Sequence, residues 1–220
     1  MSEVTITVRG ESETRVAPER ATARVSVRAE GDERARVVDG VMGLAEPVRE
    51  SIAHLEPSGA VADWSSTSMT VRAERPWNAE GRRLDPVYHA SIDVTATFTS
   101  VTELSTWMSD ISSWDGVEVG AIDWHLTPET RARVERDVAA AAVEVAVGRA
   151  RAYADALGLS HVTPVEIADV GLLSPGQPGP GPAAMKARGV AFAADAGPSM
   201  QYEPDDILIA ATVEARFIAR

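Results

Sequence analysis

The chain has 220 residues, of which 45% are hydrophobic and 25% charged, and its formal net charge at pH 7 is −12. That length accommodates one large domain or two small interlocked ones, with a hydrophobic core large enough to be stable without disulfide bonds or metal ions. The sequence contains no cysteine, which excludes disulfides, thiol catalysis and cysteine-ligated metal centres. The acidic balance makes nucleic acid or an anionic membrane surface an unfavourable partner.

The N-terminal sequence, MSEVTITVRG, lacks the basic start and apolar stretch of a signal peptide. No window reaches the roughly 18 apolar residues that a membrane-spanning helix needs. The expected location is therefore the cytoplasm, without a membrane span.

Two strands are expected at the start of the chain, because apolar and polar residues alternate there with a period of two. The first covers residues 4–8 and is expected to break at Gly10. The second covers residues 21–30, where small apolar residues form one face. Its other face is polar and carries Arg24 and Arg28. This face is expected to be solvated or to contact another subunit.

A helix follows over residues 37–55, with apolar residues three and four positions apart. Pro47 lies inside it, so we expect a kink or a break near Gly43. Alternation then predicts a strand over 65–73 and, after a polar loop, the clearest strand of the chain over 89–98.

A capping box from Ser100 to Glu103 opens a short helix that is expected to end before Gly116. A strand over 117–126 follows. Thr127, Pro128 and Glu129 have the residue types of a helix start, and the longest helix is expected to run from there to about Leu157. Its inner stripe is expected to consist of Val134, Val138, Ala141, Ala142, Val145, Ala152 and Ala156.

A strand over 162–171 and a long final strand over 206–219 complete the predicted elements. Between them, residues 175–205 are rich in proline and glycine, which predicts a flexible excursion. The predicted order is ββαββαβαββ. It indicates an α+β fold with antiparallel or mixed sheets, one long helix and two shorter ones.

The chain is expected to form a single domain, residues 1–220, with two interlocked halves of about 1–99 and 100–220. Strand–helix–strand–strand occurs near 20–99 and again near 117–219, which suggests a degenerate internal duplication.

Several stretches resemble the SIMPL-domain family of bacterial and eukaryotic proteins, which includes periplasmic-antigen-like members. They lie in order along nearly the whole chain. The stretches are Gly10-Glu11 with VAPERATARVSVRAEG, SSTSMTVRAER with Tyr88-His89-Ala90 and SIDVTATF, Gly116-Val117 with VGAIDWHLT, ARAYADALGL, and PDDILIAATVEARF. The resemblance implies an α+β fold, large ring-like or channel-like oligomers among exported bacterial members, and a loose link to stress tolerance. It implies no catalytic residues. The sequence departs from the pattern in lacking an export signal and in its long excursion.

Candidate interface residues are Trp77, Arg82 and Arg83 in the polar loop, and Arg24 and Arg28 on the polar strand face. An exposed aromatic residue beside arginines is typical of an interface anchor.

The sequence predicts no catalytic, cofactor or metal site. His54, His89, His125 and His161 fall in different elements without the spacing of a metal site. The serines of DWSSTSMT lack a nucleophile elbow. No phosphate-binding loop or dinucleotide fingerprint is present.

The favoured function is therefore a non-enzymatic, self-assembling scaffold or interaction protein that forms a homo-oligomer or binds a protein partner. A stress-related role is suggested by the resemblance alone. The alternative is a monomeric or dimeric module that binds a peptide or small ligand with the loop at 175–205. A hydrolase of unrecognised type ranks last.

Overall fold

The computed structural model describes residues 3–173 and 202–220. These residues form seven strands, three α-helices and one 3-10 turn at Glu56–Ser58. The elements are β1 (Val4–Val16), β2 (Arg20–Gly31), α1 (Arg34–Leu55), β3 (Val61–Glu74), β4 (Val87–Phe98), α2 (Val101–Ile111), β5 (Val117–His125), α3 (Pro128–Ala156), β6 (Val162–Asp169) and β7 (Ile207–Ala219). The predicted order and the α+β class are confirmed.

The described residues divide into two compact units. Unit 1 contains residues 3–17, 127–173 and 206–220, and unit 2 contains 18–126 and 202–205. The boundary expected near residue 99 falls inside unit 2, between β4 and α2, because β5 pairs with β2. The predicted excursion at 175–205 lies outside the described residues except for its last four positions.

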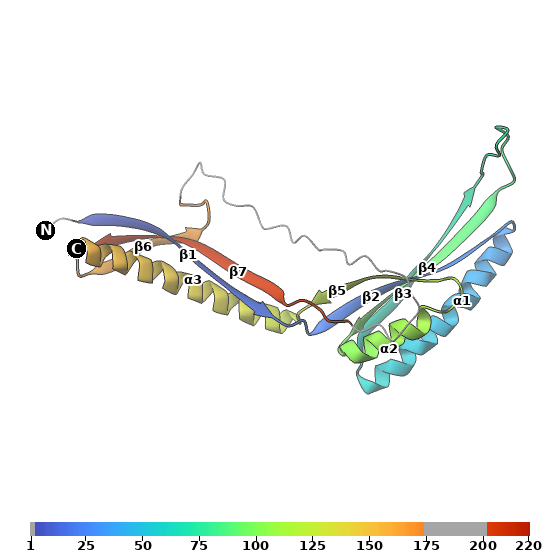
Figure 1. Cartoon of the computed structure of the whole chain (residues 1–220), viewed down its shortest axis with the longest axis horizontal. Helices are drawn as coiled ribbons and strands as arrows, with labels where there is room; N and C mark the ends of the chain where they lie inside the picture. The colour runs from blue at the N-terminus through green and yellow to red at the C-terminus, as the bar shows by residue number, and fades with distance from the viewer. Residues whose placement is uncertain (1–2, 174–201) are drawn as a thin grey trace. The chain divides into compact units, whose positions relative to one another are not determined.

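Unit 2 is a four-stranded antiparallel sheet with strand order β3-β4-β2-β5, and α1 and α2 cover one of its faces (Figure 1). Small and β-branched residues of β2 and β4 point inward beneath the helices. They form a continuous core with Ile52 of α1 and with Leu104 and Met108 of α2.

Unit 1 is a three-stranded antiparallel sheet with strand order β1-β7-β6, and α3 lies along it (Figure 1). Its own core contains Ile6 and Val8 of β1, Phe217 of β7 and a row of alanines from α3. Because these side chains are small, the helix and the sheet approach closely.

The two units share one topology, which supports the predicted duplication but moves its second copy. In unit 2 the chain order β2-α1-β3-β4 gives the spatial order β2-β4-β3. In unit 1 the chain order β1-α3-β6-β7 gives the spatial order β1-β7-β6. The second copy therefore begins with β1 and not with β5. Strand β5 lies outside the repeat and is the fourth strand of the unit 2 sheet.

The capping signals at the starts of α2 and α3 were predicted correctly. The Ser100 side chain accepts a hydrogen bond from the backbone N–H of Glu103, at the start of α2. The Thr127 side chain accepts one from the backbone N–H of Thr130, at the start of α3, and Pro128 follows as the first helical residue. Side chains of these types satisfy N–H groups that have no partner within the helix.

Two predicted interruptions are absent from the described elements. Strand β1 does not break at Gly10 but continues to Val16, because Gly10 pairs with Val213 of β7. Helix α1, where a kink or a break was expected near Gly43, continues through Gly43 and Pro47 without a break. Its buried side chains, including Ala45 and Val48, keep it on the sheet on both sides of the proline.

The predicted inner stripe of α3 is correct only in its first half. The buried residues repeat every four positions and are Val134, Val138, Ala142, Ala146, Ala150 and Ala154. Val145, Ala152 and Ala156 are exposed instead. A repeat of four exceeds the 3.6 residues of a helical turn, so the buried seam drifts around α3 as the helix follows the twisted β1–β7 pair.

Candidate functional site

The face of the unit 2 sheet opposite α1 and α2 is polar, and we call it the polar face. Strand alternation directs Arg24 and Arg28 of β2 onto it, as predicted, and both residues are exposed. Strand register sets out two rows of side chains across it. One row is Arg28, Ser91 and Thr70, and the next is Glu30, His89 and Arg72.

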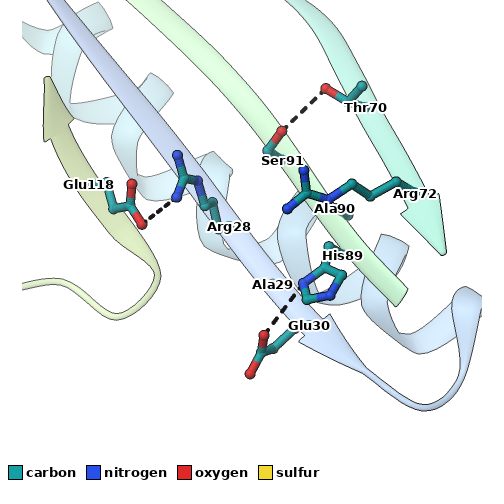
Figure 2. Close-up of a pocket in the computed structure, with 9 residues that line it drawn as sticks. All are labelled: Arg28, Ala29, Glu30, Thr70, Arg72, His89, Ala90, Ser91 and Glu118. Carbon is teal, nitrogen blue, oxygen red and sulfur yellow. Dashed lines mark hydrogen bonds and ion pairs between the residues drawn. The ribbon is translucent and has the colours of Figure 1, made fainter. Parts of the chain in front are cut away.

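These two rows line a cavity of about 480 Å³ (Figure 2). Its polar lining includes Arg28, Arg72, His89 and Ser91. In Figure 2 the Arg72 side chain runs from β3 across β4, with its guanidinium end beside Ala90 and Ser91.

Arg28 is already paired within the chain. Its Nη1 lies 2.6 Å from Glu118 Oε1 of β5, and each side chain is 57% exposed. Solvent screens such a pair, which contributes at most about 1 kcal/mol to stability. In the described part of the chain, Arg24 and Arg72 form no ion pair.

His89 lies between two carboxylates. Glu30 Oε2 is 3.4 Å from its Nδ1, and Glu74 Oε2 is 3.8 Å from its Nε2. The two carboxylates thus approach different nitrogens of the ring, so the three side chains do not converge on one cation. Among the described residues, no group of three His, Asp or Glu side chains is placed to hold a metal ion.

Two pairs of hydroxyl groups on the polar face are within hydrogen-bonding distance. Ser91 Oγ and Thr70 Oγ1 are 3.2 Å apart, and Thr22 Oγ1 and Thr97 Oγ1 are 3.0 Å apart. A serine nucleophile needs a hydrogen bond to a base. Here Ser91 bonds with Thr70, while both nitrogens of the nearby His89 face carboxylates.

A second surface is the end of the β3–β4 hairpin, residues 75–85, which we call the β3–β4 tip (Figure 1). Trp77 is 61% exposed there and Leu84 is 47% exposed. The Arg83 guanidinium lies over the Trp77 ring, 5.0 Å from its centroid. The structure therefore places an exposed aromatic residue beside an arginine here, and the interface role of the pair stays a prediction.

Backbone hydrogen bonds order the β3–β4 tip. Trp77 and Arg83 form a β-bridge. The Asn78 side-chain oxygen accepts hydrogen bonds from the backbone N–H groups of Glu80 and Arg82. Gly81 has a φ of 75°, which glycine adopts without strain. The turn therefore presents Trp77 on a defined backbone.

The other histidines lie apart from His89: His125, also on the polar face, is opposite Arg20 at the far end of β2 from Glu30. His54 Nδ1 is 2.8 Å from the Glu50 carbonyl oxygen in α1, and His125 Nδ1 is 3.2 Å from the Asp123 carbonyl oxygen in β5. His161 Nδ1 is 2.9 Å from Ser160 Oγ, between α3 and β6. The structure thus brings Trp77, Arg82 and Arg83 together and groups Arg24 with Arg28, but it does not gather the histidines.

Sequence reasoning missed the cavity and the position of Arg72 in it. The alternation of β3 and β4 was recognised, and it implies that Arg72 and His89 point away from the core. That the two are neighbours follows only from the strand register, which is irregular between Ser65 and Ser68 of β3.

These features define an α+β protein of two antiparallel units with repeated topology, a polar sheet face and an aromatic hairpin tip. A comparison with known protein families matches residues 6–217 to SIMPL, described as a protein of unknown function (DUF541), and the chain belongs to this family. A comparison with curated proteins found no match. No helix of the described residues is long and apolar enough to cross a membrane.

Proposed function

We propose that this SIMPL-family chain is a non-enzymatic interaction protein that associates with further copies of itself, and that the β3–β4 tip is one contact surface. The observation that carries the proposal is the 61% exposure of Trp77 on a hydrogen-bonded turn. Tryptophan and arginine are enriched among the residues that dominate binding energy at interfaces. An ordered turn also loses less conformational entropy when it binds.

Charge favours another copy as the partner. The tip, residues 75–85, contains three arginines, one glutamate and one aspartate, a net charge of +1, whereas the whole chain carries −12. The β3–β4 tip therefore complements the acidic surface that the rest of another copy presents. Self-association through the tip should accordingly weaken as salt screens the charges.

The test is the absolute mass in solution, measured by light scattering after size exclusion at low and high salt. The wild-type chain should have a mass that is a multiple of the monomer, and Trp77→Ala should lower it. Met42→Ala is the matched control, because Met42 is 50% exposed on α1 and lies outside the tip. An unchanged mass in Trp77→Ala would contradict the role of the tip.

A second candidate function is the binding of a small carboxylate or phosphate in the cavity of the polar face. This candidate corresponds to the alternative of a module that binds a small ligand. The loop at 175–205, which was expected to bind that ligand, lies outside the described residues except for its last four positions. The observation that favours it is Arg72, whose guanidinium faces the cavity without an ion pair among those residues (Figure 2). A guanidinium with free donors binds carboxylate or phosphate well.

Titration calorimetry with inorganic phosphate and with acetate tests this candidate. Arg72→Gln should abolish the binding heat, while Arg75→Gln, an exposed arginine outside the cavity, should preserve it. Equal binding by wild type and Arg72→Gln would rule the site out.

A further inference from the structure

The outer edge of β1 carries no strand in the described part of unit 1. In unit 2 the matching edge, on β2, is occupied by β5. The shared topology makes these edges equivalent, because β1 and β2 are the first strands of the two copies. This edge of 13 residues, which has no neighbouring strand among the described residues, presents backbone N–H and C=O groups that can pair with a further strand, although the Arg9 carbonyl oxygen already accepts a hydrogen bond from Arg149.

We propose that the β1 edge pairs antiparallel with the β1 edge of a second copy, about a twofold axis at Gly10. The result is a continuous six-stranded sheet, β6-β7-β1 followed by the same strands of the other copy. This contact is distinct from the β3–β4 tip and does not depend on it.

The register about Gly10 brings opposite charges together. It pairs Val4 with Val16 of the second copy and so uses the whole length of β1. On the sheet face away from α3, it places Arg9 opposite Glu11 of the second copy, and Glu11 opposite that copy's Arg9. Opposite charges directly across an antiparallel pair stabilise it. Shifting the register by two residues either way sets Arg9 opposite Arg9, or Glu11 opposite Glu11.

The flank of α3 beside β1 is suited to a second helix. The flank is a row of residues four positions apart, which runs beside the buried residues of α3 on one side. The row consists of Asp137, Ala141, Val145 and Arg149. Arg149 Nη1 donates a hydrogen bond to the Arg9 carbonyl oxygen, 2.9 Å away, which fixes this flank on the β1 side. Ala141 is small, and Val145 is 42% exposed although apolar.

A hollow of about 410 Å³ lies along the same side of unit 1. It is lined by Ser12, Thr14 and Val16 of β1 and by α3 residues that include Asp137 and Ala141. The hollow lies between the α3-facing side of β1 and the helix, and the helix flank next to it is apolar at Ala141 and Val145. A twofold contact would use both features.

The spacing is compatible with helix packing. Neighbouring strands are about 4.8 Å apart, so helices centred over each β1–β7 pair would lie about 10 Å from each other. Helices with small contact residues pack at about 8–10 Å. Because Gly10 lies under Ala142 and Ala146, the twofold axis passes close to Val145 of both copies.

The first test compares two charge reversals on β1, using the full chain in the Trp77→Ala background. In each dimer, Glu11→Lys places a lysine opposite Arg9 at two equivalent positions, where the like charges repel. Glu13→Lys also changes two positions, but there the lysine lies opposite the neutral Thr7. Within the chain, Glu11 pairs with Thr212 and Glu13 with Ala210, so neither change removes an ion pair. Glu11→Lys should raise the dimer dissociation constant about tenfold or more in sedimentation equilibrium, and Glu13→Lys should change it little.

The second test introduces the same charge at two positions of α3. Val145→Glu places two carboxylates near the twofold axis and should abolish the dimer. Ala140→Glu adds a charge on the outer side of the helix, away from the buried seam, and should leave the dimer intact.

Three results would overturn the proposal. They are a wild-type chain that stays monomeric, equal effects of Glu11→Lys and Glu13→Lys, or a dimer that survives Val145→Glu. Failure of the tip proposal would appear differently, as an unchanged mass in Trp77→Ala, and the charge-reversal test remains valid in that case.

Discussion

Gly10 is the residue on which the close approach of β1 and α3 depends. A Cβ atom added there would lie 1.9 Å from the Ala142 carbonyl oxygen and 2.8 Å from the Ala146 backbone nitrogen. Both neighbours are backbone atoms of a helix, which cannot rotate aside as a side chain would. The strand and the helix would have to separate over the centre of the unit 1 core.

Replacing Gly10 by alanine should therefore lower the free energy of unfolding by about 3 kcal/mol, at the upper end of the usual overpacking cost. Gly148→Ala in α3 is the control, because a Cβ there meets nothing within 4 Å. It should raise stability by about 1 kcal/mol through helix propensity. Urea unfolding of the two variants measures both effects, and a Gly10→Ala variant as stable as wild type would refute the packing argument.

Tyr202 gives unit 2 a dependence on alkaline pH. Burial raises the pKa of its phenol above the ordinary value of about 10. Its ring centroid lies 6.4 Å from that of Trp124. The unfolded chain releases this proton at a lower pH than the folded chain, so the contribution to stability is complete below pH 10. It is lost as pH rises through the folded pKa.

The stability of the wild-type chain should therefore decrease more steeply above pH 10 than that of Tyr202→Phe. Chemical unfolding at several pH values compares the two slopes, and absorbance of the phenolate follows the titration directly. Identical slopes would mean that the phenol is as well solvated in the folded chain as in the unfolded one.

At the scale of the element, the β3–β4 turn is the part whose order matters for the proposed contact. The Asn78 side chain accepts two hydrogen bonds from the turn backbone. Asn78→Ala should loosen the turn while it lowers overall stability by only about 1 kcal/mol.

If Trp77 binds through a pre-organised turn, Asn78→Ala should weaken self-association although the tryptophan itself is retained. Light scattering over a concentration series measures this effect. Unchanged association would show that the tryptophan binds without an ordered turn.

Elements whose signals are local were predicted well from the sequence. The starts of α2 and α3 follow from Ser100 and Thr127, because a cap and its N–H partner lie within three residues. The drift of the α3 seam was not predicted, because it depends on the twist of a sheet whose strands are far apart in the sequence. Strand β1 was predicted too short for the same reason, since its pairing partner is β7.

The candidate surfaces show the same division. Trp77 beside Arg83 could be proposed from composition, because the two lie in one short loop. The grouping of Arg72, His89 and Ser91 required the β3–β4 register, and the equivalence of the β1 and β2 edges required the topology of both sheets. Neither can be derived from the alternation of single strands.

At the scale of the whole molecule, unit 2 lies almost entirely in one continuous segment, residues 18–126, whereas unit 1 joins the two ends of the described chain. The nearest partners in the β1–β7 pairing, Val16 and Ile207, are 191 positions apart. The nearest partners in the β2–β4 pairing, Gly31 and Tyr88, are 57 apart. By chain entropy alone, closing the larger loop costs about 1 kcal/mol more.

This arrangement imposes an order of events during synthesis on the ribosome. The strands and helices of unit 2 are complete once Leu126 has emerged, while β1 must wait without its partner until β7 has been made. Pulse-labelling hydrogen exchange during refolding should accordingly protect the amides of β2 and β4 before those of β1 and β7. Until β7 has been made, Ile6 and Val8 of β1 remain exposed to solvent in the nascent chain. This apolar segment is one that a chaperone can bind.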